Sequence, residues 1–166
     1  MTAGAGTDAE HARVGDQLET REKVVYQRAL AERAFSAESI HNDDYTRRQG
    51  YPGALVSAYV LCGYMSEPLV RFFGASWFTS GEISLRFIGK GVQQHDLVRC
   101  GGIVREIAPD SDHQRRRVFL DIWMEKADGV RPVIGTASAI VPEPVGHPAS
   151  SAGSDEAEQA RREGSE

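Results

Sequence analysis

The chain has 166 residues, of which 40% are hydrophobic, and this is enough for one domain with a single apolar core. Its formal net charge of -5 at pH 7 provides no basic surface for nucleic acid, so we expect no nucleic-acid partner. The two cysteines, Cys62 and Cys100, lie in apolar segments and have no neighbour at the spacing of metal ligands. They are therefore predicted to be reduced, buried thiols in a cytoplasmic protein.

Neither the N-terminus nor the apolar segments indicate a membrane protein. The longest apolar run, residues 54–73, is interrupted by two serines, a glutamate, a proline and an arginine. The first residues lack the basic start and apolar stretch of a signal peptide. We therefore expect a cytoplasmic protein with no membrane partner. Residues 1–20 and 145–166 are small and polar, and they predict disordered tails on either side of one ordered domain, residues 21–144.

Three segments in the first half of this domain show secondary-structure patterns. Residues 23–35 begin with a β-favouring Val-Val-Tyr run and are predicted to be a strand, although their second half would also suit a helix. Residues 43–50 predict a short helix with Asp43 as its N-terminal cap and a glycine at its end. Residues 54–73 predict the main helix, because apolar residues recur there at helical spacing: Leu55, Ala58, Cys62, Met65 and Leu69.

Four later segments predict strands instead. Apolar and polar residues alternate in residues 82–88, 95–107, 117–126 and 133–141, and Gly101-Gly102 suggests a bulge or bend in the second of these segments. Short connections between them predict an antiparallel meander, whose apolar face must cover the apolar helix. The predicted fold class is therefore α+β. We expect a single hot-dog fold, in which a curved antiparallel sheet wraps around one long central helix.

The stretch that could carry chemistry is residues 36–60. His41 lies there between two carboxylates, Glu38 and Asp43, and ahead of a Gly-Tyr-Pro-Gly loop that ends at Gly53 and leads into the main helix. A helix that begins after such a loop directs its first N–H groups, and the positive end of its dipole, back at the loop. A carbonyl oxygen held there would be polarised, and the imidazole could move a proton at the adjacent carbon.

Three stretches, in this order and spacing, carry a family resemblance: Ile40-His41-Asn42-Asp43 followed by Gly50-Tyr51; Phe73-Gly74 followed by Trp77 and Leu85-Arg86-Phe87; and His95-Asp96-Leu97-Val98. Together they resemble the MaoC-like acyl dehydratases and (R)-specific enoyl-thioester hydratases of the hot-dog superfamily. The resemblance spans most of residues 35–141. It implies a homodimer that acts on an acyl thioester of coenzyme A or of an acyl carrier protein, and it implies no metal and no organic cofactor.

The resemblance also implies roles for individual residues. His41 would be the acid/base group. The thioester carbonyl would lie in an oxyanion hole at the start of the main helix, near the N–H groups of Ser57, Ala58 and Tyr59 and beside Gly53. The acyl tail would run towards the helix–sheet interface along Tyr59, Tyr64, Met65 and Phe72. For most of these residues taken individually, plain packing in the core is the favoured interpretation.

The sequence departs from the family's Asp-x-Asn-Pro-(Ile/Leu)-His motif. Aligned on the histidine, the family's aspartate, asparagine, proline and helix-start glycine become Ser36, Glu38, Ser39 and Ala58. Either Glu38 or Asp43 replaces the missing carboxylate, or His41 works alone, and the chain is then a dehydratase, a hydratase or a related conjugate-addition lyase. Two alternatives stay open. One is a hot-dog acyl thioesterase that uses one of these carboxylates, and the other is a non-catalytic protein that binds an acyl group or a polyketide-type intermediate.

Overall fold

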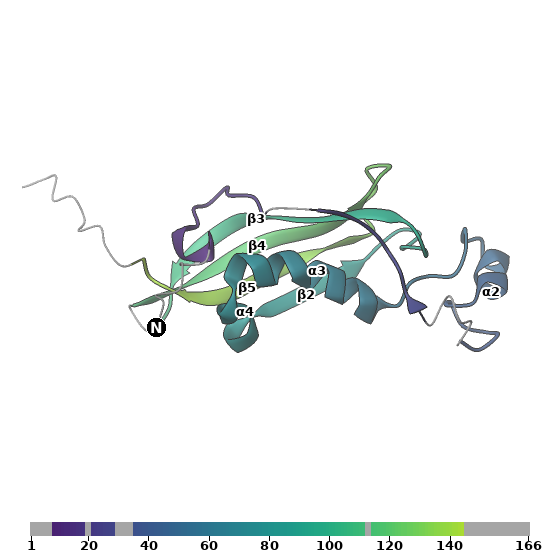
Figure 1. The fold of residues 1–166 in the computed structure, drawn as a ribbon, viewed down its shortest axis with the longest axis horizontal. Coiled ribbons are helices and arrows are strands. Elements are labelled where there is room, and N and C mark those ends of the chain that lie inside the picture. The colour runs from purple at the N-terminus through teal and green to yellow at the C-terminus, as the bar shows by residue number, and fades with distance from the viewer. Residues whose placement is uncertain (1–7, 19–20, 29–34, 112–113, 145–166) are drawn as a thin grey trace, which may run out of the picture.

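The computed structural model describes residues 8–18, 21–28, 35–111 and 114–144. Five antiparallel strands form one sheet in the order β1-β3-β4-β5-β2, and helix α3 lies across one face of it (Figure 1). This arrangement confirms the predicted α+β hot-dog architecture. The predicted four-strand meander is correct only for β3, β4 and β5, because β2 pairs with β5 and not with β3. The strands are β1 (Glu22–Val24), β2 (Glu82–Phe87), β3 (Leu97–Pro109), β4 (Arg115–Lys126) and β5 (Val133–Pro142). The helices are η1 (Asp8–His11), α2 (Asp43–Arg48), α3 (Ala58–Phe73) and α4 (Ala75–Ser80). No helix in the described ranges is long and apolar enough to cross a membrane.

The core lies between α3 and the sheet face that it covers. Every second residue of β4 is buried there: Val118, Leu120, Ile122 and Met124. One side of α3 supplies the opposing layer, which consists of Leu61, Met65, Leu69, Phe72 and Phe73. Each such side chain stabilises the fold by about 1.5–3 kcal/mol through the apolar surface that it removes from water. The two periodicities in the sequence, two residues for a strand and 3.6 for a helix, thus correspond to the two layers of the core.

Helix α3 begins at Ala58, later than the predicted start at residue 54. The residues before it are held in an extended conformation by the loop that precedes β3. Leu55 forms an isolated β-bridge with Gln93, and the Val56 N–H donates a 2.8 Å hydrogen bond to a carbonyl in that loop, that of Val92. Pro68 lies inside α3 without ending it. The helix ends at Gly74, whose φ of 57° glycine adopts readily, and the short helix α4 that follows was not predicted.

The segment from Asp8 to Leu18 packs on the sheet, so the prediction of a disordered tail is wrong for these residues. Ala9, Ala12 and Leu18 are each at most 4% exposed and belong to the core. The guanidinium of Arg116 on β4 donates hydrogen bonds to three backbone carbonyls of the segment, those of Ala9, Glu10 and Ala12. Residues 1–7, 19–20 and 145–166 lie outside the described residues, and the predicted tail limits there stay predictions.

Gly102 has a different role from the one predicted. The register of β3 shifts between Val104 and Glu106, and not at the glycine pair. A Cβ added to Gly102 would come within 3.1 Å of the Asp121 carbonyl oxygen and 3.4 Å of the Leu18 side chain. The closest approach would be to the Ile122 side chain of β4, at 3.0 Å, so the glycine leaves room for the neighbouring strand. The N-terminal segment also contacts β3 at this point, where the Leu18 N–H donates a 3.0 Å hydrogen bond to the Gly102 carbonyl.

The first predicted strand is confirmed only at its start. Glu22–Val24 pairs with β3, and Val25 continues the contact through backbone hydrogen bonds with His95 and Asp96. Residues 26–28 lie outside the strand, and residues 29–34 are not described. The chain therefore leaves the sheet edge at about Tyr26 and turns towards the start of α3.

Candidate active site

The His41 ring is held by one contact at each nitrogen. Nδ1 lies 2.6 Å from the backbone carbonyl oxygen of Leu55, and Nε2 lies 3.4 Å from the hydroxyl oxygen of Ser57. A carbonyl oxygen can only accept a hydrogen bond, so Nδ1 carries the proton in the neutral ring and Nε2 presents its lone pair to Ser57. The ring of Phe35 lies beside the imidazole, with 4.7 Å between the ring centroids.

The loop that carries His41 is fixed by hydrogen bonds to the residues before α3. The Leu55 N–H donates to the Ile40 carbonyl at 2.9 Å, and the Ala54 N–H donates to the Asp43 carboxylate at 2.7 Å. A Cβ on Gly53 would lie 3.1 Å from that same carboxylate oxygen, so a glycine suits this close approach. Gly53 and Asp43 therefore shape the loop around the site.

Asp43 does not cap α2 as predicted. The N-cap is Asn42, whose side-chain oxygen accepts a 3.1 Å hydrogen bond from the Tyr45 N–H. An asparagine in extended conformation satisfies this N–H as well as an aspartate would. The Asp43 side chain is thereby left to bind the Ala54 N–H across the loop.

Neither candidate carboxylate contacts the histidine ring. Over the part of the chain that the structure describes, no hydrogen bond or ion pair joins Glu38 or Asp43 to the imidazole of His41. Glu38 is exposed, while Asp43 lies 3.9 Å from the guanidinium of Arg47 and bonds the loop backbone. Of the predicted catalytic residues, the structure brings His41 alone to the start of α3.

The start of α3 offers two backbone donors where three were expected. Ser57 is the N-cap residue, and its N–H already donates a 2.7 Å hydrogen bond to the side-chain oxygen of Gln27. The N–H groups of Ala58 and Tyr59 lie in the first helical turn, where no carbonyl of the helix can accept from them. Both residues are exposed, so a ligand could approach the helix at this point.

Gln27 is the site residue that the sequence did not reveal. It is 4% exposed, and its amide nitrogen donates to the Ser57 hydroxyl at 2.9 Å and to the Tyr59 hydroxyl at 3.1 Å. The side chain of Gln94 binds the Gln27 backbone, because its oxygen accepts from the Gln27 N–H and its nitrogen donates to the Gln27 carbonyl. Gln27 and Ser57 are 30 positions apart, and a glutamine in a predicted strand gives no local signal of this contact.

The expected path for an acyl tail is filled by the core. Met65 and Phe72 are 1% and 7% exposed and pack between α3 and the sheet. The Tyr64 hydroxyl bonds the backbone of the β1 edge, accepting from Tyr26 and donating to Val24. Only Tyr59, which is 67% exposed, stands open beside the site. Met65 and Phe72 therefore serve as packing residues, in line with the interpretation favoured for most of these side chains individually.

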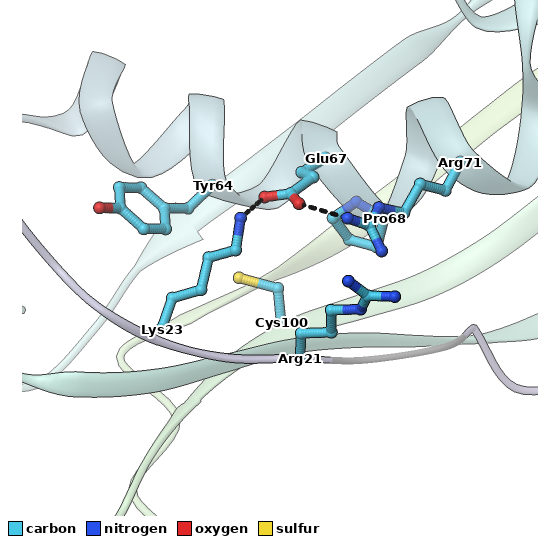
Figure 2. Close-up of a pocket in the computed structure, with 7 residues that line it drawn as sticks. All are labelled: Arg21, Lys23, Tyr64, Glu67, Pro68, Arg71 and Cys100. Carbon is cyan, nitrogen blue, oxygen red and sulfur yellow. Dashed lines mark hydrogen bonds and ion pairs between the residues drawn. The ribbon is translucent and has the colours of Figure 1, made fainter.

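A separate cleft lies farther along α3, where Glu67 is about 15 Å along the helix from Ser57 at the usual helical rise. Figure 2 shows Lys23 of β1 reaching across it to Glu67 of α3, with the Cys100 thiol below them. The hydrogen bond from Lys23 lowers the pKa of the Glu67 carboxyl, and the nearby charges of Lys23 and Arg71 add to this effect. Burial raises the pKa of the Cys100 thiol to about 12. The ion pair joins β1 to α3, and the thiol below it is unreactive because it stays protonated. We therefore interpret this cleft as a structural contact between β1 and α3 and not as a catalytic site.

No protein-family model and no curated protein sequence matches the chain. Several solved structures share its fold. A MaoC-like dehydratase from Rhodospirillum rubrum superposes with a TM-score of 0.67 and 16% sequence identity, over 85% of this chain and 99% of the dehydratase. The unliganded R-hydratase PhaJ1 from Pseudomonas aeruginosa gives 0.62 and 17%, over 84% of this chain and 88% of the hydratase. An (R)-hydratase from A. caviae involved in PHA biosynthesis gives 0.58 and 18%, over 80% and 98%. The chain therefore has the hot-dog fold of the MaoC-like dehydratases and (R)-hydratases.

Proposed function

We propose that the chain is a lyase that removes water from, or adds water to, an acyl thioester carried by coenzyme A or by an acyl carrier protein. The observation that carries this proposal is the position of His41 Nε2, which lies 3.4 Å from the hydroxyl oxygen of Ser57, the N-cap residue of α3. At that same point the Ala58 and Tyr59 N–H groups have no acceptor within the helix. A base and a pair of anion-binding donors thus lie at the same end of α3.

In the dehydration direction, the thioester carbonyl oxygen accepts hydrogen bonds from the Ala58 and Tyr59 N–H groups. These donors stabilise the negative charge that develops on the oxygen as the α-carbon loses its proton, and one such donor is typically worth about 3 kcal/mol. His41 takes the α-proton on Nε2. The carbon–oxygen bond at the β-carbon then breaks, and the departing hydroxyl leaves as water with a proton returned from His41. One proton carrier is sufficient, because the proton that is removed is the proton that is delivered.

In this scheme neither candidate carboxylate takes over the proton transfer that the family's aspartate performs. We propose that Asp43 positions the loop through the Ala54 N–H and that Glu38 takes no part in proton transfer. Replacing Glu38 by Gln is then expected to leave turnover unchanged. An inactive Glu38→Gln enzyme would instead assign the acid/base work to this carboxylate.

A homodimer is part of the same proposal. Strand β2 is a sheet edge, and among the described strands it pairs only with β5. Ile83 and Phe87 of β2 point to the α3 side of the sheet yet are 38% and 47% exposed, and Phe78 of the neighbouring α4 is 76% exposed. An exposed apolar edge of this kind is a site of strand pairing, and a second copy would satisfy it by continuing the sheet.

A second candidate function is thioester hydrolysis, which one observation favours. The Ser57 hydroxyl lies near one nitrogen of His41, and the other nitrogen of the ring is held by a hydrogen bond. The same arrangement is found in nucleophile–base pairs. Against it, Ser57 is only 3% exposed and the Ser57–His41 contact is 3.4 Å long. We therefore place hydrolysis second.

The test compares crotonyl, 3-hydroxyacyl and saturated acyl thioesters with the same protein. Interconversion of the first two supports the lyase, release of free thiol from the saturated thioester supports the hydrolase, and binding without turnover supports an acyl-binding protein. For the lyase, His41→Ala is expected to lower kcat by roughly 10²–10⁴-fold, the usual contribution of a positioned acid/base group. The control is His95→Asn, because His95 is exposed with a φ of 68°, which asparagine tolerates. Full turnover in His41→Ala would refute the mechanism.

A further inference from the structure

We propose that Gln27 is a positioning residue that orders the protons along a chain of hydrogen bonds from Gln27 through Ser57 to His41 and on to the Leu55 carbonyl. The chain specifies which nitrogen of His41 is protonated and directs the Ser57 hydroxyl proton at the other one. The order of the chain follows from the geometry alone. Only its catalytic consequence rests on the proposed function.

One end of the chain is fixed by a group that can only donate. The Ser57 backbone N–H lies 2.7 Å from the Gln27 side chain, so the Gln27 atom facing it must be the carbonyl oxygen. The amide nitrogen of Gln27 then has to face the other way, towards the Ser57 hydroxyl at 2.9 Å and the Tyr59 hydroxyl at 3.1 Å. The Ser57 hydroxyl oxygen is therefore an acceptor in its contact with Gln27.

The other end is fixed by a group that can only accept. The Leu55 carbonyl requires a proton on His41 Nδ1, which leaves Nε2 of the neutral ring as an acceptor. A hydroxyl has one proton, and Ser57 does not need it for Gln27. Its proton therefore points along the 3.4 Å contact to His41 Nε2, and every hydrogen bond of the chain runs in the same direction.

Burial keeps water from replacing the partners in these hydrogen bonds. Gln27 and Ser57 are 4% and 3% exposed, and the Gln94 side chain holds the Gln27 backbone through two hydrogen bonds. A buried amide in such a position costs free energy if it turns, because its oxygen and nitrogen would then face the wrong partners. Gln27 is also neutral, so it orders the ring without placing a negative charge next to it, as a carboxylate would.

The chain gives the proposed reaction a proton route. When Nε2 of His41 gains a proton, it becomes a donor to the Ser57 oxygen, which has a second lone pair for it. The Ser57 hydroxyl proton then turns away from the ring. The proton balance is closed, because His41 holds the proton taken from substrate and Ser57 only changes the direction of its own.

The test is nuclear magnetic resonance of the full-length chain labelled with ¹⁵N in histidine, which reports the protonation of each ring nitrogen without any substrate. His41 signals are assigned as those lost in His41→Asn. In the wild type at pH 8 we expect a neutral ring with the proton on Nδ1. A neutral His41 ring with its proton on Nε2 would overturn the inference.

Gln27→Glu keeps the size of the side chain and its acceptor for the Ser57 N–H, but it removes the donor to the Ser57 hydroxyl. The hydroxyl then donates to the carboxylate, so we expect Nε2 of His41 to lose its hydrogen bond from Ser57 and its ¹⁵N signal to move towards that of a ring nitrogen without a hydrogen bond. The matched control is Gln17→Glu, which adds the same charge at an exposed position on the N-terminal segment. Identical ring signals in Gln27→Glu and the wild type would refute the positioning role.

If Gln27→Glu does not fold, Ser57→Ala tests the same chain. It retains the backbone N–H that binds Gln27 and removes only the hydroxyl. The Nε2 signal should then move to the value of a ring nitrogen without a hydrogen bond, and an unmoved signal would contradict the inference. Failure of the lyase assay with these ring signals as expected would reject the proposed function and leave the inference standing, so the two failures are distinguishable.

Discussion

Leu18 provides a quantitative test of how the N-terminal segment contributes to stability. Its side chain is 4% exposed and lies against β3 at Gly102. Leu18→Ala removes three carbons, and at about 0.8 kcal/mol for each buried carbon this amounts to about 2.4 kcal/mol of lost transfer free energy. A residual cavity adds to this cost, while the edge position allows partial collapse that reduces the cavity. We therefore expect the free energy of unfolding to fall by about 2–4 kcal/mol.

The assay is equilibrium unfolding in urea, with the denaturant slope compared between variants to confirm that the same surface is exposed. Val14→Ala is the matched control, because Val14 belongs to the same segment and is 64% exposed. A chain that starts at residue 8 should be as stable as the full chain, whereas one that starts at residue 19 should lose at least as much as Leu18→Ala. If Leu18→Ala and Val14→Ala are equally stable, the segment does not form part of the core.

Two further predictions concern the thiol of Cys100 and the β2 edge. Because burial raises the Cys100 pKa from an ordinary value of about 9 to about 12, folding stability is fully present below pH 9 and is lost as pH rises towards 12. Between pH 8 and pH 10.5 the free energy of unfolding of the wild type should fall by about 2 kcal/mol more than that of Cys100→Ala. Urea titrations that give equal losses for the two proteins would contradict the burial argument. At the β2 edge, sedimentation should give a dimer for the wild type and a monomer for Phe87→Lys, with Val14→Lys as the exposed control; a Phe87→Lys dimer would exclude this edge as the interface.

The elements that the sequence predicted best are those whose pattern is local. In β4, apolar residues alternate with more polar neighbours: Val118, Leu120, Ile122 and Met124. Such alternation predicts a strand with one buried face, and it also determines which side chains point to the core. Helix α3 has the corresponding helical spacing, but its buried face is turned from the predicted one: Ala58 is exposed, and Cys62, which was predicted to be buried, is only partly so. Its start was misplaced because the residues before Ala58 are held extended by Val92 and Gln93, and nothing within residues 54–57 indicates those partners.

The parts that the sequence missed depend on contacts between distant positions. The N-terminal segment has few apolar residues, and it is anchored by Arg116 and by a backbone hydrogen bond to Gly102, both far along the chain. The candidate site shows the same limitation. The sequence pointed to His41 and to the start of α3 correctly as neighbours, but it offered Glu38 and Asp43 as ring partners because they are close in sequence. The groups that contact the ring nitrogens come from residues 55 and 57.

The absence of an aspartate at Ser36 is therefore weak evidence against acid/base chemistry. What a catalytic imidazole needs from its second nitrogen is an acceptor held in one place, and a backbone carbonyl meets that need when its own segment is rigid. The Leu55 carbonyl is rigid in this sense, because the Leu55 N–H binds the Ile40 carbonyl and the same residue is bridged to Gln93. A carboxylate would add a negative charge that favours the protonated ring, whereas a carbonyl and the neutral Gln27 leave the ring ready to accept a proton. A reaction in which one base removes a proton and returns it requires no more than this.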